Sequence, residues 1–249
     1  MDIIARGNKV KLFNVAAVLL LLAGYSHQSS ASVIVLDFEN IEKHPGTNST
    51  FIDDFYNGGT ASNGNSGTNY GVSFSSNALN VCMNTLQVFC SNTSRGGQGN
   101  PNSQFAGLFF LSGDETYMNV AAGFATGFSF FYSAINQTGS VSVYDGLNGT
   151  GNLLATLALG LTDTDCPAGY GAGYCTYKAI GMTFSGIAKS VSFAGVADRI
   201  AFDDVTFGSA TPDTPVDVPA PGMLALFGLG LFAVAGRRHK PQHGQKNTG

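Results

Sequence analysis

The sequence predicts an all-β protein whose body is an antiparallel β-sandwich of jelly-roll type, with an N-terminal signal helix and a short C-terminal hydrophobic helix. Two observations lead to this prediction. Only 11% of the 249 residues are charged, against roughly 25% in ordinary soluble domains, and long surface helices need Glu and Lys on their wet faces. The chain also has 33 glycines and short apolar runs separated by Gly, Asn, Ser and Asp, which favours strands and turns.

Nine short runs are expected to be strands, and no long stretch of 3.6-residue periodicity lies between them. The first, at 33–39, passes from β-branched residues to apolar/acidic alternation, which is typical of a strand with one wet face. The others are expected at 70–74, 105–111, 124–132, 140–144, 153–159, 177–184, 189–196 and 199–207. Phe128, Phe130 and Tyr132 share one parity and should face the core of the sandwich, which we expect to span 32–209.

Residues 1–31 have the order of a secretory signal peptide. Three bases lie within 1–11, an apolar stretch of about 13 residues follows at 12–24, and small residues occupy 29–31. This tripartite pattern predicts cleavage after Ala31, because the apolar stretch is too short for a comfortable membrane span. A buried N-terminal helix is the alternative.

The C-terminal end has its own pattern. A proline-rich linker at 210–221 breaks the chain from the body, since proline donates no backbone hydrogen bond and disfavours helix before it. Residues 222–240 combine about 15 uncharged residues, expected to be helical, with a basic cluster that should stay on the cytoplasmic side of a membrane. The stretch is shorter than the roughly 20 residues of a membrane span. A buried helix is the alternative, and 241–249 should be a disordered tail.

A Pro-x-Pro tripeptide, a short Leu/Gly/Ala-rich helix and a terminal Arg-Arg cluster together resemble the PEP-CTERM sorting signal of exported bacterial proteins. Ala220 replaces the glutamate of the Pro-Glu-Pro motif, and 241–249 extend past the usual basic end. The resemblance implies processing by an exosortase, contact with the inner membrane during sorting, and a final place at the cell surface or in an extracellular matrix. It rests on Val218, Pro219, Ala220, Pro221, Arg237 and Arg238.

The body is acidic. Between Ser32 and Val218 the chain carries 5 bases and 15 acids. A field of this sign repels phosphate backbones, which bind to clustered Lys and Arg. We therefore expect no nucleic-acid partner.

Four cysteines lie in a chain expected to reach an oxidising compartment. We predict disulfides between Cys82 and Cys90 and between Cys166 and Cys175, since each pair brackets a glycine- or asparagine-rich loop. A zinc site is the alternative, although the spacings lack Cys-x-x-Cys and His44 is the one histidine of the body.

Four carboxylates form a candidate metal site. Asp37 and Glu39 lie two apart on the first expected strand and so share a face, while Asp203 and Asp204 lie on or beside the last. If those strands meet, clustered hard oxygen ligands would favour calcium. The set resembles the structural calcium site of jelly-roll carbohydrate-binding modules, which implies calcium as a cofactor. Acids that decorate wet strand faces are the alternative.

Tyrosines near loop-like segments could stack on sugar rings while amides bind hydroxyls. Tyr170 and Tyr174 are the expected ligand-binding residues, and Tyr56, Tyr70 and Tyr117 lie in similar surroundings. Packing beneath loops is the alternative for each of them.

No catalytic residue is predicted. The acid pairs at 53–54 and 114–115 are adjacent in sequence, and neighbours on a strand point to opposite faces rather than across a glycosidic bond. Ser-His-Asp chemistry lacks a Gly-x-Ser-x-Gly motif. We expect a non-enzymatic exported surface or extracellular-matrix protein. The alternatives are a calcium-assisted module that binds extracellular polysaccharide and, further, a glycoside hydrolase.

Overall fold

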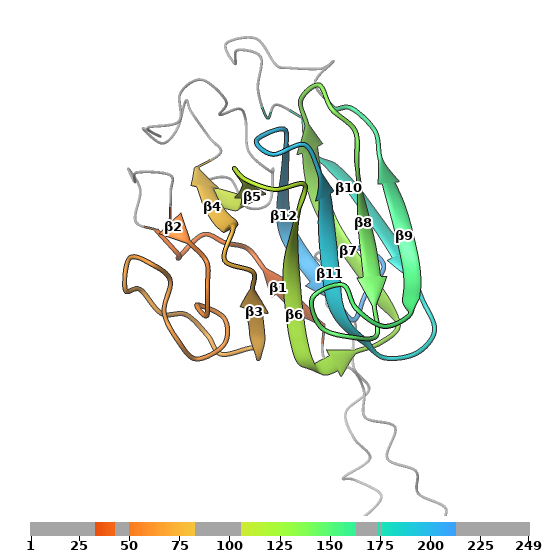
Figure 1. Cartoon of the computed structure of the whole chain (residues 1–249), viewed down its shortest axis with the longest axis horizontal. Helices are drawn as coiled ribbons and strands as arrows, with labels where there is room; N and C mark the ends of the chain where they lie inside the picture. The colour runs from red at the N-terminus through yellow and green to blue at the C-terminus, as the bar shows by residue number, and fades with distance from the viewer. Residues whose placement is uncertain (1–32, 43–49, 83–105, 163–173, 175, 213–249) are drawn as a thin grey trace, which may run out of the picture. The chain divides into compact units, whose positions relative to one another are not determined.

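The computed structural model describes residues 33–42, 50–82, 106–162, 174 and 176–212. The chain divides into two compact units at 215/216, and all described residues belong to the first unit. They form twelve β-strands arranged as two antiparallel sheets (Figure 1). Within the described ranges, no helix is long and apolar enough to cross a membrane. The predicted signal peptide, sorting motif, hydrophobic helix and tail lie outside the described residues.

The larger sheet has seven strands. These are β1 (Ile34–Leu36), β2 (Thr50–Phe51), β4 (Ala78–Cys82), β5 (Ala106–Phe110), β7 (Gly127–Ala134), β10 (Lys178–Thr183) and β12 (Ile200–Phe207). Their order is β10-β7-β12-β5-β4-β2, with β1 also paired to β12. The smaller sheet has five strands, which are β3 (Val72–Phe74), β6 (Glu115–Phe124), β8 (Gly139–Tyr144), β9 (Leu153–Leu159) and β11 (Ala188–Gly195). Their order is β3-β6-β11-β8-β9.

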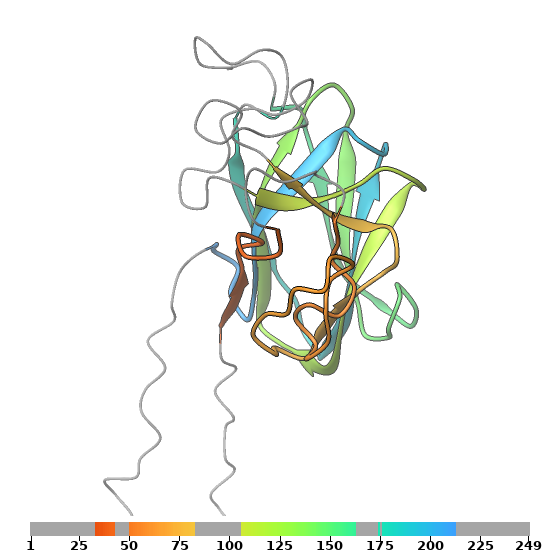
Figure 2. The ribbon, with the colours of Figure 1, turned by 90° about the vertical axis from the view of Figure 1, so that its left-hand side faces the viewer.

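The two sheets pack face to face around an aromatic core (Figures 1 and 2). Phe193 of β11 is fully buried, and its ring centroid lies 4.8 Å from that of Phe202 on β12. Phe128 and Phe130 of β7 lie 6.0 and 6.1 Å from Phe193. Phe128, Phe130 and Tyr132 are all buried, so the predicted core face of this strand is confirmed.

The central strands of the larger sheet are buried on both faces. Every residue of β4, β5 and β12 is buried. A second apolar cluster, formed by Leu79, Val81, Phe109, Tyr174 and Ala201, packs separately from the main core. These strands therefore bury consecutive side chains on both faces, including the polar residues Asn80, Asp203 and Asp204.

The first and last strands, β1 and β12, are paired, which the predicted calcium site requires. Ile34 pairs with Phe207 and Leu36 pairs with Val205 in antiparallel register. β5 pairs with the same edge of β12 nearer its N-terminal end, where Phe202 pairs with Leu108. A register shift between Asp203 and Thr206 separates these two stretches. Such a bulge bends the strand and increases its twist, which lets β12 pair with two different neighbours along one edge.

All nine expected strand regions contain a strand, so the two-sheet antiparallel sandwich is confirmed. The jelly-roll subtype stays a prediction. Three strands were not expected from the sequence, namely β2, β4 and β6. The first expected strand also ends early, because β1 stops at Leu36 and Phe38 has a φ of 58°. The alternation that placed Asp37 and Glu39 on one strand face is therefore wrong.

The last described residues run across two strands of the larger sheet. The Gly208 amide donates to the Gly127 carbonyl over 2.9 Å, and the Ser129 hydroxyl donates to the Ser209 carbonyl over 3.0 Å. A Cβ at Gly181 would collide with the carbonyl oxygen of Ala210 and would lie 2.7 Å from the Ser129 Cβ. Only a residue without a side chain fits beneath this segment.

We expect Gly181→Ala to lower the free energy of unfolding by about 1–3 kcal/mol, because the backbone at 209–210 must move away from the sheet. Gly160→Ala is the matched control, since a Cβ at Gly160 meets nothing within 4 Å. The control should change stability by no more than about 0.5 kcal/mol. Urea unfolding of both variants measures the difference, and equal midpoints would contradict the close approach.

Candidate functional site

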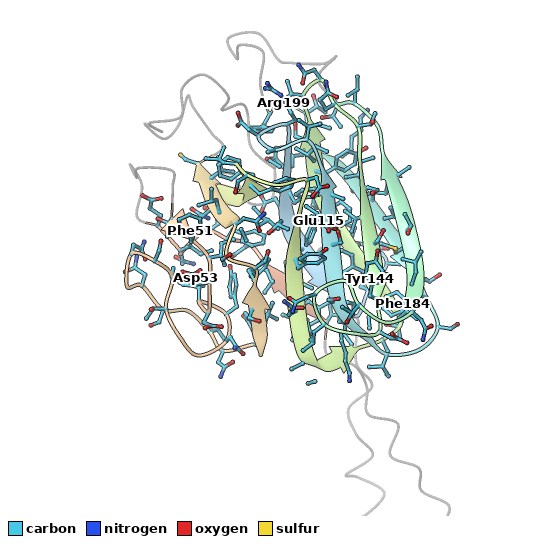
Figure 3. The ribbon with its side chains drawn as sticks, in the orientation of Figure 1. Phe51, Asp53, Glu115, Tyr144, Phe184 and Arg199 are labelled. Carbon is cyan, nitrogen blue, oxygen red and sulfur yellow. The ribbon has the colours of Figure 1, made fainter. Side chains whose placement is uncertain are left out.

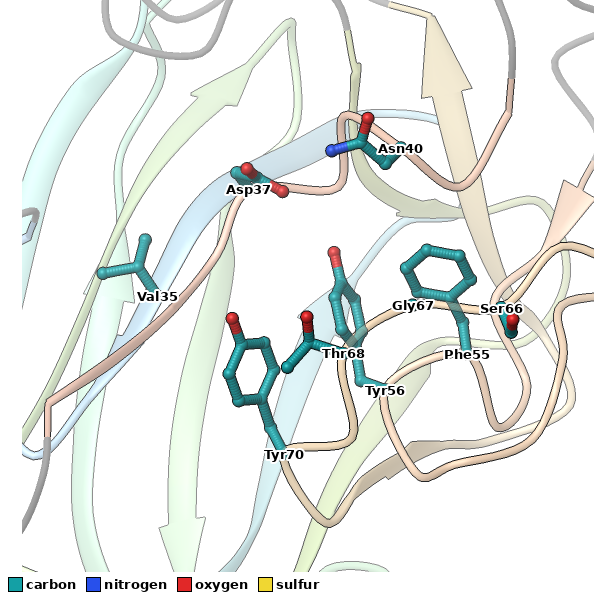
Figure 4. A pocket seen from close by; sticks show the side chains of 9 residues that line it. All are labelled: Val35, Asp37, Asn40, Phe55, Tyr56, Ser66, Gly67, Thr68 and Tyr70. Atoms are coloured by element: carbon teal, nitrogen blue, oxygen red, sulfur yellow. The ribbon is translucent and has the colours of Figure 1, made fainter.

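A pocket of ≈ 190 Å³ lies between the segment that follows β1 and the long connection from β2 to β3 (Figure 4). Figure 4 shows Tyr70, Thr68 and Tyr56 on one side, facing Val35 and Asp37 on the other. Aromatic and polar side chains line it together. The lining residues are Val35, Asp37, Asn40, Phe55, Tyr56, Ser66, Gly67, Thr68 and Tyr70.

Three aromatic rings form one wall. Phe55 and Tyr56 contact edge to face at 4.8 Å between centroids, and Tyr56 and Tyr70 lie 6.1 Å apart with an interplanar angle of 31°. Phe55 and Tyr56 are buried, at 2% and 4% exposure, whereas Tyr70 is 37% exposed. Tyr70 is therefore the ring that offers its surface to a ligand.

Backbone hydrogen bonds fix the aromatic wall. The Tyr56 carbonyl accepts from the amides of Tyr70 at 2.8 Å and Val72 at 3.2 Å. The Gly67 amide donates to the Phe55 carbonyl at 3.3 Å. A Cβ at Gly67 would collide with the Phe55 ring, so this glycine lets the connection pass close to the aromatic side chain.

Three hydrogen bonds connect the segment after β1 to the connection from β2 to β3. The Phe38 amide donates to the Tyr56 hydroxyl over 3.0 Å in a buried hydrogen bond. The side-chain amides of Asn63 and Asn65 both donate to the Ile41 carbonyl, at 2.9 and 3.1 Å. The pocket is consequently braced by direct bonds between its walls and is formed before a ligand arrives.

The polar side of the pocket depends on the turn after β1. Phe38 is fully buried and has a left-handed φ of 58°, which directs the chain away from the sheet and leaves Asp37 exposed. The Asp37 carboxylate accepts from the Glu39 amide at 3.3 Å. Asn40, Ser66 and Thr68 are exposed and add amide and hydroxyl groups. Together they offer both donors and acceptors to a hydroxylated ligand.

Acidic groups influence the buried hydroxyl of the pocket. Burial raises the pKa of Tyr56 well above its ordinary value, and the charges of Asp37 and Asp203 raise it further. Both carboxylates therefore lie within electrostatic reach of one phenol. Because the phenol stays protonated at neutral pH, its oxygen can accept from the Phe38 amide while its proton remains available for donation.

The four carboxylates predicted to bind calcium differ in burial, and Asp37 is the exposed one. Glu39 is half-buried and accepts from the Ala106 amide at 3.2 Å, while Asp203 and Asp204 are buried in β12. The Asp204 amide donates to the Asp203 carboxylate at 2.7 Å. Among the residues that the structure describes, no three His, Cys, Asp or Glu side chains form a group that could hold a metal. Calcium binding by this set stays a prediction.

Tyr174, one of the two predicted ligand-binding tyrosines, does not line the pocket. It is fully buried in the second apolar cluster, so its ring has no face exposed for stacking. Tyr170 lies outside the described residues. Cys82 is disulfide-bonded, whereas Cys90, Cys166 and Cys175 lie outside them, so the pairing stays a prediction.

The acid pairs considered for hydrolysis have local partners. Asp54 accepts from the side-chain amide of Asn57 at 3.2 Å. Glu115, on the outer face of the smaller sheet, accepts from the hydroxyls of Tyr117 and Ser192. Burial, followed by the hydrogen bond to Glu115, raises the pKa of Tyr117 to about 12.

Part of this pocket was predicted from the sequence. Tyr56 and Tyr70 were expected as tyrosines near loops and Asp37 as a metal ligand, but the three were not predicted to line one pocket. Asn40, Ser66 and Thr68 were missed. For Ser66 and Thr68 the reason is that 58–69 is almost wholly Gly, Ser, Thr, Ala and Asn, a composition that indicates only an exposed loop. The usable signal was the pair of tyrosines at the two ends of this polar stretch.

Residues 217–239 match the model of the PEP-CTERM protein-sorting motif. The match includes the predicted motif residues from Val218 to Arg238, and the motif implies export and sorting by an exosortase. A comparison with curated proteins finds no match to this chain.

Solved carbohydrate-binding modules are similar to the body. A family 6 module studied for its binding sub-sites is 21% identical, with a TM-score of 0.31, covering 44% of this chain and 77% of that one. A Clostridium stercorarium family 6 module in complex with cellobiose is 18% identical, with a TM-score of 0.30, covering 47% and 79%. Clostridium thermocellum xylanase 10B modules with xylohexaose are 15% identical, with a TM-score of 0.34, covering 75% and 29%. Likenesses at these TM-scores assign no site residue.

Proposed function

We propose that this is a non-enzymatic, exosortase-processed protein of the cell surface or extracellular matrix. We further propose that its sandwich binds polysaccharide through the pocket between the segment that follows β1 and the connection from β2 to β3. The observation that carries the binding role is the half-exposed Tyr70 ring beside amide, hydroxyl and carboxylate groups. An aromatic face packs against the apolar face of a sugar, and convergent polar groups bind its hydroxyls.

The size of the pocket supports a small ligand unit. Pockets for drug-sized ligands measure roughly 300–1,000 Å³, whereas this one measures ≈ 190 Å³. A single sugar ring suits this volume, with the rest of a chain outside it. Asp37 carries the one carboxylate among the described lining residues, and glycosidases use two facing carboxylates. This composition favours binding over hydrolysis.

Tyr70→Ala should weaken glycan binding by at least about tenfold, the factor that corresponds to about 1.4 kcal/mol. The test is a glycan array, followed by titration calorimetry on the best oligosaccharide, with the exported protein. Tyr144→Ala is the matched control, because Tyr144 is a half-buried tyrosine of β8 that does not line the pocket, and Figure 3 shows it well apart from Asp53. Binding that Tyr70→Ala leaves unchanged would place the site elsewhere.

Calcium assistance is a separate part of the proposal, involving Asp37, Glu39, Asp203 and Asp204. The same titration is repeated with added calcium and with a chelator. An affinity that falls on chelation supports a calcium requirement, and an affinity that stays constant removes calcium from the proposal.

A further inference from the structure

The walls of the pocket are built from an acidic part of the chain. Residues 33–82, which supply every lining residue, contain five acids and one base, Lys43. The acids are Asp37, Glu39, Glu42, Asp53 and Asp54. Concave sites lined by one sign of charge concentrate ligands of the opposite sign and repel those of the same sign.

Asp37 supplies the one carboxylate among the described lining residues. Asp37 is exposed and lines the pocket opposite Tyr70 and Tyr56 (Figure 4). No lining residue among those described carries a positive charge. Asp37 is therefore the source of negative charge among the described lining residues.

The aromatic wall also attracts cations. The faces of tyrosine and phenylalanine rings carry negative electrostatic potential and attract ammonium groups within about 6 Å. Phe55, Tyr56 and Tyr70 gather three such rings on one side of the pocket. A ligand ammonium held between these rings and Asp37 would have a charge-assisted hydrogen bond on one side and a cation–π contact on the other.

We infer that the pocket selects sugars by charge, binding an amino sugar with a free ammonium more tightly than its neutral counterpart and rejecting uronic acids. This inference rests on the proposed polysaccharide binding and names the ligand class of the same site. Exposed Asp37 is the group that distinguishes the ammonium from a hydroxyl. A uronate carboxylate would meet Asp37 with like charge, which is unfavourable.

The experiment compares three β-1,4-linked oligosaccharides of equal length, made of glucosamine, glucose or glucuronic acid, by titration calorimetry with the exported protein at low salt. The glucosamine oligomer should bind at least about tenfold more tightly than the glucose oligomer. The glucuronic acid oligomer should bind more weakly than both. Added salt should reduce these differences, because mobile ions screen exposed charges.

Asp37→Asn is the decisive variant, since asparagine keeps an oxygen that can accept from the Glu39 amide. It should bring the affinities for the glucosamine and glucose oligomers to within about threefold of each other, chiefly by weakening glucosamine binding. Asp114→Asn is the matched control, because Asp114 is exposed and does not line the pocket. It should keep the wild-type preference.

The outcomes separate the two proposals. Glucose binding that Tyr70→Ala weakens, combined with equal or tighter uronate binding, overturns charge selection and leaves the proposed function standing. A glucosamine preference that survives Asp37→Asn also overturns the inference. If neither the array nor any of the three oligomers gives binding, the proposed function and the inference both fail.

Discussion

Replacing Phe193 with alanine is expected to lower the free energy of unfolding by about 3–5 kcal/mol. Phe193 is fully buried on β11 of the smaller sheet, and its ring contacts Phe202, Phe128 and Phe130 of the larger sheet. Truncation removes buried apolar surface and leaves a cavity between the two sheets. Both effects lower the free energy of unfolding. Urea unfolding monitored by circular dichroism measures the loss.

Phe51→Ala is the control for this prediction. Phe51 is also a phenylalanine on a strand, but it is 40% exposed on β2. Its truncation should change stability by no more than about 0.5 kcal/mol. If Phe193→Ala is as mild as Phe51→Ala, the aromatic packing between the sheets is not the core of the sandwich.

Replacing Tyr56 has the second large effect, and it involves both stability and the pocket. Tyr56→Ala should cost about 3–5 kcal/mol, because a buried ring in contact with Phe38 and Phe55 is lost. Tyr56→Phe keeps the ring and removes only the acceptor of the Phe38 amide. It should cost about 1–3 kcal/mol, the penalty for leaving a buried donor without its partner.

Comparing the two Tyr56 variants separates packing from hydrogen bonding. Urea unfolding gives the two stability losses, and titration with the best oligosaccharide gives the effect on the site. Tyr56→Phe should weaken binding, since the segment that carries Asp37 loses its direct bond to the aromatic wall. Equal stability of Tyr56→Phe and wild type would mean that this hydrogen bond contributes nothing to the fold.

The sequence predicted the sandwich well because most strands have local signatures. β7 is the clearest case, with aromatic residues of one parity at Phe128, Phe130 and Tyr132. β4 was missed because Asn80 interrupts its apolar run. The Asn80 amide donates to the Phe38 carbonyl at 2.9 Å, a partner 42 residues away that the local sequence does not reveal.

β6 was missed for a different reason. It begins at Glu115 within an acidic turn-like stretch, and before its last residue, Phe124, it contains Ala121, Ala122 and Gly123, which have low strand propensity. Its buried positions Thr116, Met118 and Val120 alternate correctly, yet pairing with β3 and β11 is what fixes this strand. Tertiary pairing therefore overrides a weak local preference.

The pocket was harder to predict than the sheets. Its walls are joined by contacts between residues far apart in sequence, such as Phe38 with Tyr56, 18 residues apart, and Asn65 with Ile41, 24 residues apart. The left-handed conformation of Phe38 runs against the ordinary preference of a bulky residue. Burial of the Phe38 ring compensates for this strain. Because that burial depends on distant parts of the chain, no local sequence pattern predicts the left-handed conformation.

The pairing of β1 with β12 places both ends of the described body on neighbouring strands. β12 also has β7 along its other edge, so the strand that leads toward the C-terminal segment is an interior one. Tension transmitted through that segment would act along β12, across hydrogen bonds that lie perpendicular to the strand. These bonds would have to shear together rather than open one by one.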